Sequence, residues 1–168
     1  FVGLQAGNFT MGSGATSVSH ASYNTGVGYK ALSSLTTGSY NTAMGQYALA
    51  FNTTGVSNVA IGRTALYNNT TGGSNAAMGI SAMYLNTTGE RNAVVGASAL
   101  YNNTTGGYNV AIGNFSLYNN TTGGYNTAMG QYALAFNTTG GSNAAVGNKA
   151  GGYIGPIGYS FTTCSLDG

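Results

Sequence analysis

Side chains able to do acid–base or nucleophilic chemistry are few in this chain. Its only carboxylates are Glu90 and Asp167, its only imidazole is His20 and its only thiol is Cys164. A hydrolase needs a base beside a nucleophile or a pair of carboxylates, and a metal site built from oxygen ligands needs several carboxylates. A lone Cys forms no internal disulfide. We therefore expect no enzyme, no metal site and no bound cofactor.

Asparagine offers a different chemistry. Sequons of the form N-x-S/T, which accept N-linked glycans, recur along the chain, and a row of glycans would protect and solubilise a chain of low charge. The same Asn-Thr-Thr-Gly letters are also explained by turn chemistry, in which Asn and Thr side chains bond to the backbone, and this interpretation is favoured. Six sequons form one evenly spaced column: Asn52, Asn69, Asn86, Asn103, Asn120 and Asn137.

Charge is scarce throughout the sequence. Four basic and two acidic residues in 168 give a net charge of +2, and 4% of residues are charged, against about 25% in soluble domains. This is too little positive charge for nucleic-acid binding. No apolar run approaches the ~20 residues of a membrane-spanning helix, and no signal peptide is visible. The hydrophobic residues, 42% of the chain, stand at fixed intervals, which argues against disorder.

A 17-residue repeat determines which elements position these side chains. Gly stands four residues after each Asn and is preceded by Val, Ile or Met. Ala follows seven residues after the Asn, with one exception at Ser116, and Leu or Met comes next until Gly151. The sixteen residues that begin at Tyr40 return unchanged five units later, at Tyr125. The repeated asparagines are Asn24, Asn41, Asn58, Asn75, Asn92, Asn109, Asn126 and Asn143.

This repeat predicts an all-β fold, a parallel β-solenoid with 17 residues per coil and about eight regular coils. Equal positions would stack at ~4.8 Å, the Val/Ile/Met and Leu columns would face inward, and the Asn column would form an amide ladder. Ala and Gly would stand where opposing walls approach closely. A helix is excluded because Gly and Asn-Thr-Thr-Gly interrupt every stretch. We expect a partial coil and a surface loop over residues 1–22, the solenoid over 23–152, and an extended tail or cap over 153–168.

The repeated unit "YNTAMGQYALAFNTTGG" resembles repeats of phage tail-fibre proteins and bacterial surface adhesins. Its "NVAIG" core, at Asn58 and again at Asn109, is similar to the head repeats of trimeric autotransporter adhesins. The resemblance covers Tyr23 to about Gly152. It implies an extracellular, elongated β-roll that serves reach and attachment. Autotransporter heads use shorter repeats of about fourteen residues, which leaves trimerisation and the handedness of the coil open.

The two ends of the chain suggest how copies would assemble. The N-terminal residues match the unit from its third position on, and the C-terminal residues resemble the letters that precede it. We therefore predict head-to-tail stacking of copies, with the alternatives that the junction is covalent within a longer fibre or coincidental. The predicted assembly ends are Phe1, Val2, Gly3, Leu166, Asp167 and Gly168.

These observations favour a structural subunit of an extracellular fibre or adhesin stalk. Its partners would be further copies of itself and covalent glycans, without nucleic acid or a membrane span. A glycan-binding adhesin or phage tail-fibre receptor-binding module is the alternative, because an exposed row of Tyr could bind sugars. An ice-binding solenoid is a further one, although adjacent Thr residues should point to opposite faces. The two Tyr columns are expected to stack and support the ladder.

Overall fold

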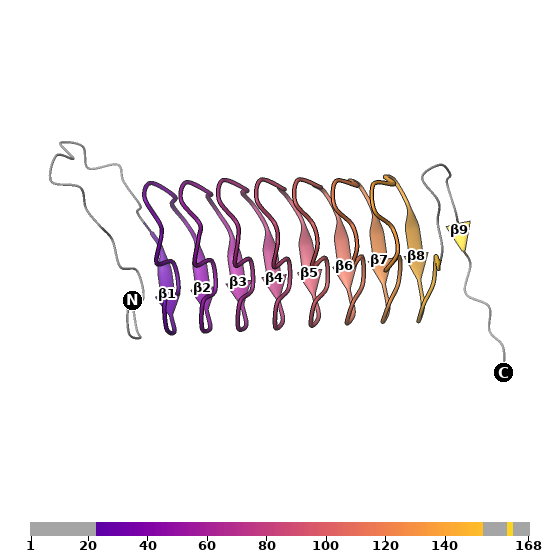
Figure 1. Cartoon of the computed structure of the whole chain (residues 1–168), viewed down its shortest axis with the longest axis horizontal. Coiled ribbons are helices and arrows are strands. Elements are labelled where there is room, and N and C mark those ends of the chain that lie inside the picture. The colour runs from indigo at the N-terminus through magenta and orange to yellow at the C-terminus, as the bar shows by residue number, and fades with distance from the viewer. Residues whose placement is uncertain (1–22, 153–160, 163–168) are drawn as a thin grey trace, which may run out of the picture.

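The computed structural model describes residues 23–152 and 161–162, and the strands in these segments form a single parallel sheet (Figure 1). Its nine strands lie side by side in chain order, each hydrogen-bonded to the next. The strands are β1 (Thr25–Val27), β2 (Thr42–Met44), β3 (Val59–Ile61), β4 (Ala76–Met78), β5 (Ala93–Val95), β6 (Val110–Ile112), β7 (Thr127–Met129), β8 (Ala144–Val146) and β9 (Phe161–Thr162).

Every strand pairs with its neighbour at the same position of the repeat. Ala60 of β3 lies opposite Ala77 of β4, and the same step of one repeat unit relates each pair of strands from β1 to β8. The backbone hydrogen bonds continue outside the strands, as where the Leu66 N–H donates to the Ala82 carbonyl at 2.9 Å. The predicted parallel β-solenoid with one 17-residue unit per coil is therefore confirmed. The described part of the tail, β9, keeps the same register, with Ala144 opposite Phe161.

The core consists of three stacked columns of small and medium apolar side chains. One is the middle residue of each strand, such as Ala77 or Val94, which is fully buried. The other two are the Ala and Leu columns that follow the Gly, such as Ala65 and Leu66, also fully buried. The prediction that the Leu column faces inward is confirmed. Because most core residues are Ala, the two walls of the coil lie close together.

The prediction that the Val/Ile/Met column faces inward is wrong. In a three-residue strand the side chains alternate, so burial of the middle residue turns the first and third outward. Hydrophobic size predicts the opposite, but at the strand the coil holds only Ala or Val, and the Met, Ile and Val side chains of this column lie outside. Apart from half-buried Val27, the column is 38% to 56% exposed: Met44, Ile61, Met78, Val95, Ile112, Met129 and Val146.

Glycine follows each strand for a reason other than the predicted close approach of opposing walls. Gly79 has a φ of +143°, and a Cβ on it would lie 2.4 Å from the carbonyl oxygen of Gly96 in the next coil. A side chain is thus excluded by the neighbouring rung and by the left-handed backbone. The stacking distance, rather than the width of the coil, requires glycine here.

Non-glycine residues also adopt left-handed backbone at three positions of each coil. In the third described coil these are Thr64 (φ 56°), Leu66 (φ 50°) and Ser74 (φ 58°). Such a conformation costs roughly 1–2 kcal/mol per residue. The N–H groups of these residues donate to neighbouring coils: Thr64 to Gln46 and Ser74 to Val56 in the preceding coil, and Leu66 to Ala82 in the following coil. Stacking therefore holds a backbone that a single coil would not keep.

Candidate functional site

The repeated Asn at the start of each strand forms a buried amide ladder, as predicted. Asn75 Nδ2 donates to Asn58 Oδ1 at 3.2 Å, and the backbone N–H of Asn75 donates to the same oxygen at 3.0 Å. Asn92 then makes the same two bonds to Asn75 Oδ1, both at 3.0 Å. Each Oδ1 thus accepts two hydrogen bonds from the next coil. We call this column the first Asn ladder.

The Asn of the Asn-Thr-Thr turns forms a second Asn ladder instead of a row of attachment points. Asn69 Nδ2 donates to Asn52 Oδ1 at 2.7 Å and to the Gly72 carbonyl at 2.9 Å. An N-linked glycan needs an exposed Nδ2, whereas these are buried, and from Asn69 to Asn137 each already donates twice. Their burial gives the hypothesis of N-glycans on this column less support and favours the turn interpretation. All six predicted residues are at most 1% exposed: Asn52, Asn69, Asn86, Asn103, Asn120 and Asn137.

The two ladders meet at one backbone carbonyl in each coil. The Gly72 oxygen accepts from Asn58 Nδ2 at 2.8 Å and from Asn69 Nδ2 at 2.9 Å. A Cβ on Gly72 would lie 2.5 Å from both Asn69 Oδ1 and the Gly89 oxygen, so only glycine fits at this junction. Closure of one coil and its stacking on the next therefore use the same amide groups.

The first Asn ladder has a direction. Every Nδ2 donates toward the lower-numbered coil, from Asn41 bonding to Asn24 up to Asn143 bonding to Asn126. Asn143 Oδ1 is buried and has no hydrogen-bond partner, the single such side-chain atom among the described residues. The ladder thus ends in an open acceptor.

The predicted assembly ends fall outside the described residues. They are Phe1, Val2, Gly3, Leu166, Asp167 and Gly168.

The paired Thr residues of each turn have different surroundings. Thr70 Oγ1 donates to the Thr87 carbonyl of the next coil at 3.0 Å, whereas Thr71 is exposed. The same division holds in the neighbouring coils, for example at Thr87 and Thr88. From Thr53 to Thr122, only the second Thr of each turn is therefore exposed, rather than the flat double array expected of an ice-binding face.

The Tyr columns stack as predicted. Tyr67, Tyr84 and Tyr101 follow one another with ring centroids 5.0 and 5.1 Å apart and nearly parallel planes. Burial raises the pKa of Tyr84 above its ordinary value, and the neighbouring Tyr67 and Tyr101 add to the shift. In the second column Tyr108 lies 4.8 Å from Tyr125. Each stacked ring therefore contacts the Tyr ring of a neighbouring coil and helps to hold the coils together.

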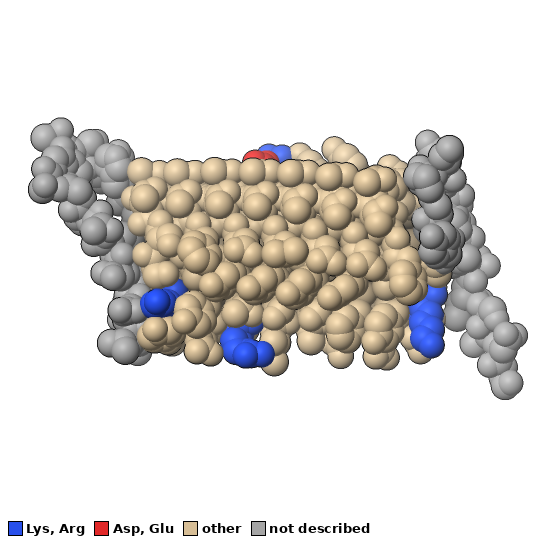
Figure 2. Space-filling model, viewed as in Figure 1, with Lys and Arg blue, Asp and Glu red and all other residues tan. Residues whose placement is uncertain are grey.

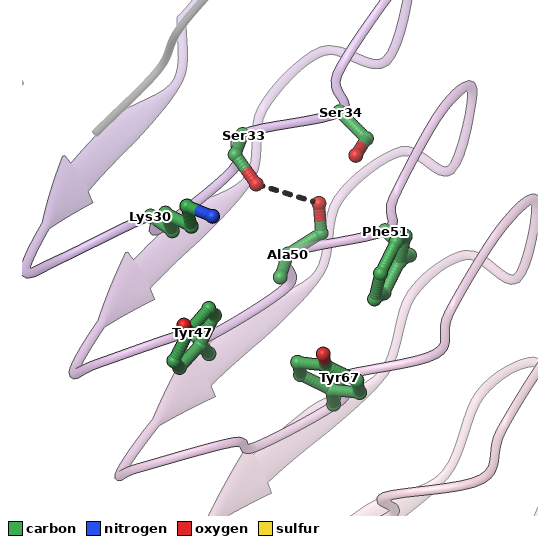
Figure 3. Close-up of a pocket in the computed structure, with 7 residues that line it drawn as sticks. All are labelled: Lys30, Ser33, Ser34, Tyr47, Ala50, Phe51 and Tyr67. Carbon is green, nitrogen blue, oxygen red and sulfur yellow. Dashed lines mark hydrogen bonds between the residues drawn. The ribbon is translucent and has the colours of Figure 1, made fainter. Parts of the chain in front are cut away.

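The first Tyr column is interrupted at its start, and a pocket of about 410 Å³ opens there (Figure 3). The corresponding positions of the first two described coils hold Ser33 and Ala50 instead of Tyr. Sequence reasoning missed this pocket, although the two small residues in a Tyr column were the signal for it. It is lined by Lys30, Ser33, Ser34, Tyr47, Ala50, Phe51 and Tyr67.

A shallower groove of about 540 Å³ runs along the turns at the other Tyr column. Gly107 and Gly124 form part of its lining, beside Tyr108 and Tyr125. Glu90, which also lines the groove, lies 3.7 Å from Arg91 on the exposed surface. The Arg91 guanidinium also lies 5.2 Å from the Tyr108 ring centroid. The charges at this groove are therefore already partnered.

Charged side chains do not gather elsewhere on the described surface. Figure 2 shows the basic side chains standing apart on the visible face, with uncharged surface between them. No group of three or more His, Cys, Asp or Glu residues lies together in residues 23–152 and 161–162. The described segments also lack any helix long and apolar enough to cross a membrane. Comparison of the chain with models of protein families, with curated proteins and with solved structures found no match.

Proposed function

We propose that this chain is a structural subunit of an extracellular fibre or adhesin stalk that assembles by head-to-tail β-stacking. The observation that carries the proposal is the open acceptor at Asn143 Oδ1. An unpaired buried amide oxygen costs about 1–3 kcal/mol. Within the chain, β9 pairs with Ala144 and Ala145 of β8. A coil of a second copy that replaces β9 against β8 and carries its own Asn in the first ladder would donate two hydrogen bonds to this oxygen, as Asn92 does to Asn75.

The uniform repeat supports stacking between copies as well as within one. Every coil presents the same backbone groups to its neighbour, so the interface between two coils needs no special residues. A contact between unlike ends of two copies does not close on itself and produces a filament. The low charge is consistent with this function, because a charge repeated in every rung would repel its copies.

Electron microscopy and sedimentation of the purified full chain test the proposal. We expect filaments whose length grows with protein concentration and whose axial repeat is that of the coils. Asn143→Ala should shorten them, since it removes the acceptor, while Asn148→Ala on the exposed surface of the same coil should not. Circular dichroism should show both variants folded.

Single rods at every concentration would overturn the proposal. In that case, binding of the rods on a glycan array would support the alternative of a glycan-binding adhesin or tail-fibre module. Thermal hysteresis would support an ice-binding solenoid. The single exposed Thr column at the turns gives the ice-binding alternative less support than a paired array would.

A further inference from the structure

We propose that the pocket at the start of the Tyr column binds one sugar ring of an acidic polysaccharide, with the carboxylate of a uronic acid against Lys30. This activity goes beyond the structural function and does not depend on filament assembly. The volume of about 410 Å³ lies in the range of small-ligand pockets, about 300–1,000 Å³. It exceeds what a few water molecules need and accommodates one pyranose ring.

Three aromatic rings give the pocket its walls. The Tyr67 ring lies at 74° to the Tyr47 ring and at 84° to the Phe51 ring, with centroids 5.8 and 5.0 Å away. Figure 3 shows Tyr47 and Phe51 on opposite sides of Ala50, with Tyr67 below them. Ring faces at steep angles suit a flat ligand with aliphatic C–H groups on its faces, which a pyranose has. Phe51 is 46% exposed, so a ligand can reach its ring.

The polar groups of the pocket match the rim of a sugar. Ser33 Oγ donates to the Ala50 carbonyl at 3.2 Å and keeps its lone pairs for a ligand hydroxyl. The Ser34 hydroxyl forms no hydrogen bond within the described part of the chain, and Figure 3 shows it pointing toward the pocket. Two hydroxyls beside aromatic walls suit a ligand rich in hydroxyl groups, rather than a purely apolar one.

Lys30 determines the charge of the ligand. Its Nζ lies 5.5 Å from the Tyr29 ring centroid and 5.9 Å from that of Tyr47, held over their faces. Glu90 is the only carboxylate in residues 23–152, and it is paired with Arg91 several coils away. The Lys30 ammonium is therefore not neutralised by an acid in this part of the chain. An anionic group on the sugar would complete the site.

The chain contains its own control for this site. The repeated sixteen residues place Tyr132, Ala135 and Phe136 where the pocket has Tyr47, Ala50 and Phe51. In the preceding coil, however, Phe115 replaces Lys30 and Tyr118 replaces Ser33.

Phe115 stacks on Tyr132 with centroids 5.0 Å apart, and it also packs against Tyr118. Aromatic rings thus occupy the place that is open in the first copy. The same sixteen residues therefore form a sugar site only where they begin at Tyr40.

Isothermal titration of the full chain with oligogalacturonate, with neutral maltooligosaccharides for comparison, tests the proposal. We expect oligogalacturonate to bind more tightly than the neutral oligomer. Lys30→Gln should weaken its binding about tenfold and remove the preference for the acid. Phe51→Ala should weaken both ligands about tenfold, while the matched variant Phe136→Ala should leave binding unchanged. Circular dichroism would show that each variant folds.

Three results would overturn the proposal. One is the absence of binding to oligogalacturonate. Another is equal loss of binding in Phe51→Ala and Phe136→Ala, which would place the site elsewhere. The third is binding of dextran sulfate that Phe51→Ala does not change, together with no preference for oligogalacturonate, because the chain would then attract polyanions by charge alone.

Discussion

The Asn75→Ala variant would test whether the first Asn ladder holds the solenoid together. The Asn75 side chain makes four hydrogen bonds: Nδ2 donates to Asn58 Oδ1 and the Gly89 carbonyl, and Oδ1 accepts from the backbone N–H and Nδ2 of Asn92. Alanine removes all four in the middle of the rod. Of these groups, the Gly89 oxygen keeps a partner in Asn86 Nδ2, but the backbone N–H of Asn92 loses its acceptor in a buried position.

The expected loss of stability follows from these contacts. At about 1 kcal/mol for each hydrogen bond, the four bonds amount to about 4 kcal/mol. The buried N–H groups that lose their acceptor also lack water to replace it, so the cost is not reduced by solvation. The matched control is Asn114→Ala. Asn114 is exposed, and its Oδ1 accepts one bond, from Ala97 N–H at 3.1 Å. We expect it to cost about 0.5 kcal/mol.

Denaturant unfolding followed by circular dichroism would measure both variants. Amide hydrogen exchange should show the loss of protection in Asn75→Ala concentrated in the coils on either side of position 75, since a solenoid is stabilised by nearest neighbours. A loss below about 1 kcal/mol for Asn75→Ala, or a loss equal to that of Asn114→Ala, would refute the claim that the amide ladder stabilises the fold.

Three further predictions concern other contacts. Gly72→Ala should cost about 3 kcal/mol in denaturant unfolding, because its Cβ would clash with Asn69 Oδ1; adjacent Gly73→Ala should cost under about 1 kcal/mol, since Val56 occupies the equivalent position. Stability should fall as pH rises through about 10 and beyond, because unfolded Tyr ionises first while the pKa of Tyr84 is raised; melting temperatures at constant ionic strength would show it. Mass spectrometry should find no N-glycan from Asn52 to Asn137 in the second ladder, and a glycan there would contradict the buried amides.

The period of the sequence was sufficient to predict the fold. A strict period with Asn, Gly, Ala and Leu at fixed places requires that equal positions meet, and the parallel register follows directly. The first Asn ladder was predictable for the same reason, since stacked amides find partners in the next rung. Local turn letters also predicted that Asn69 would bond to the backbone, as it does to the Gly72 carbonyl.

The orientation of side chains was harder to predict. Hydrophobic size placed Met78 inside and Ala77 beside it without a role, but the structure reverses them: at the strand the coil is wide enough only for the Ala or Val of the middle column, although Met83 is buried in the Leu column. Such a width depends on both walls of the coil together and cannot be read from one strand. Similarly, burial of Asn69 could not be deduced from its sequon, since the same letters are common on exposed turns.

The pocket shows how an exact repeat can hold a surface feature that is not repeated. Phe51 and Phe136 belong to identical sixteen-residue segments, and only the coils before and after these segments differ. The sequence of one repeat unit therefore determines the conformation of its coil, whereas the surface between two coils depends on the side chains of both units. Function in such a chain should be sought where the residue type at one position of the repeat changes from coil to coil.

Ser33→Tyr would test this reasoning directly. It places in the first copy the ring that Tyr118 provides beside the second, where Tyr132 and Ala135 already accommodate it. We expect stability to change by less than about 1 kcal/mol in denaturant unfolding, since the fold has room for that ring. Binding of oligogalacturonate should be lost, because the ring would fill the pocket. Retained binding would mean that the interruption of the Tyr column does not create the site, and a large loss of stability would mean that equivalent positions in the two copies are not interchangeable.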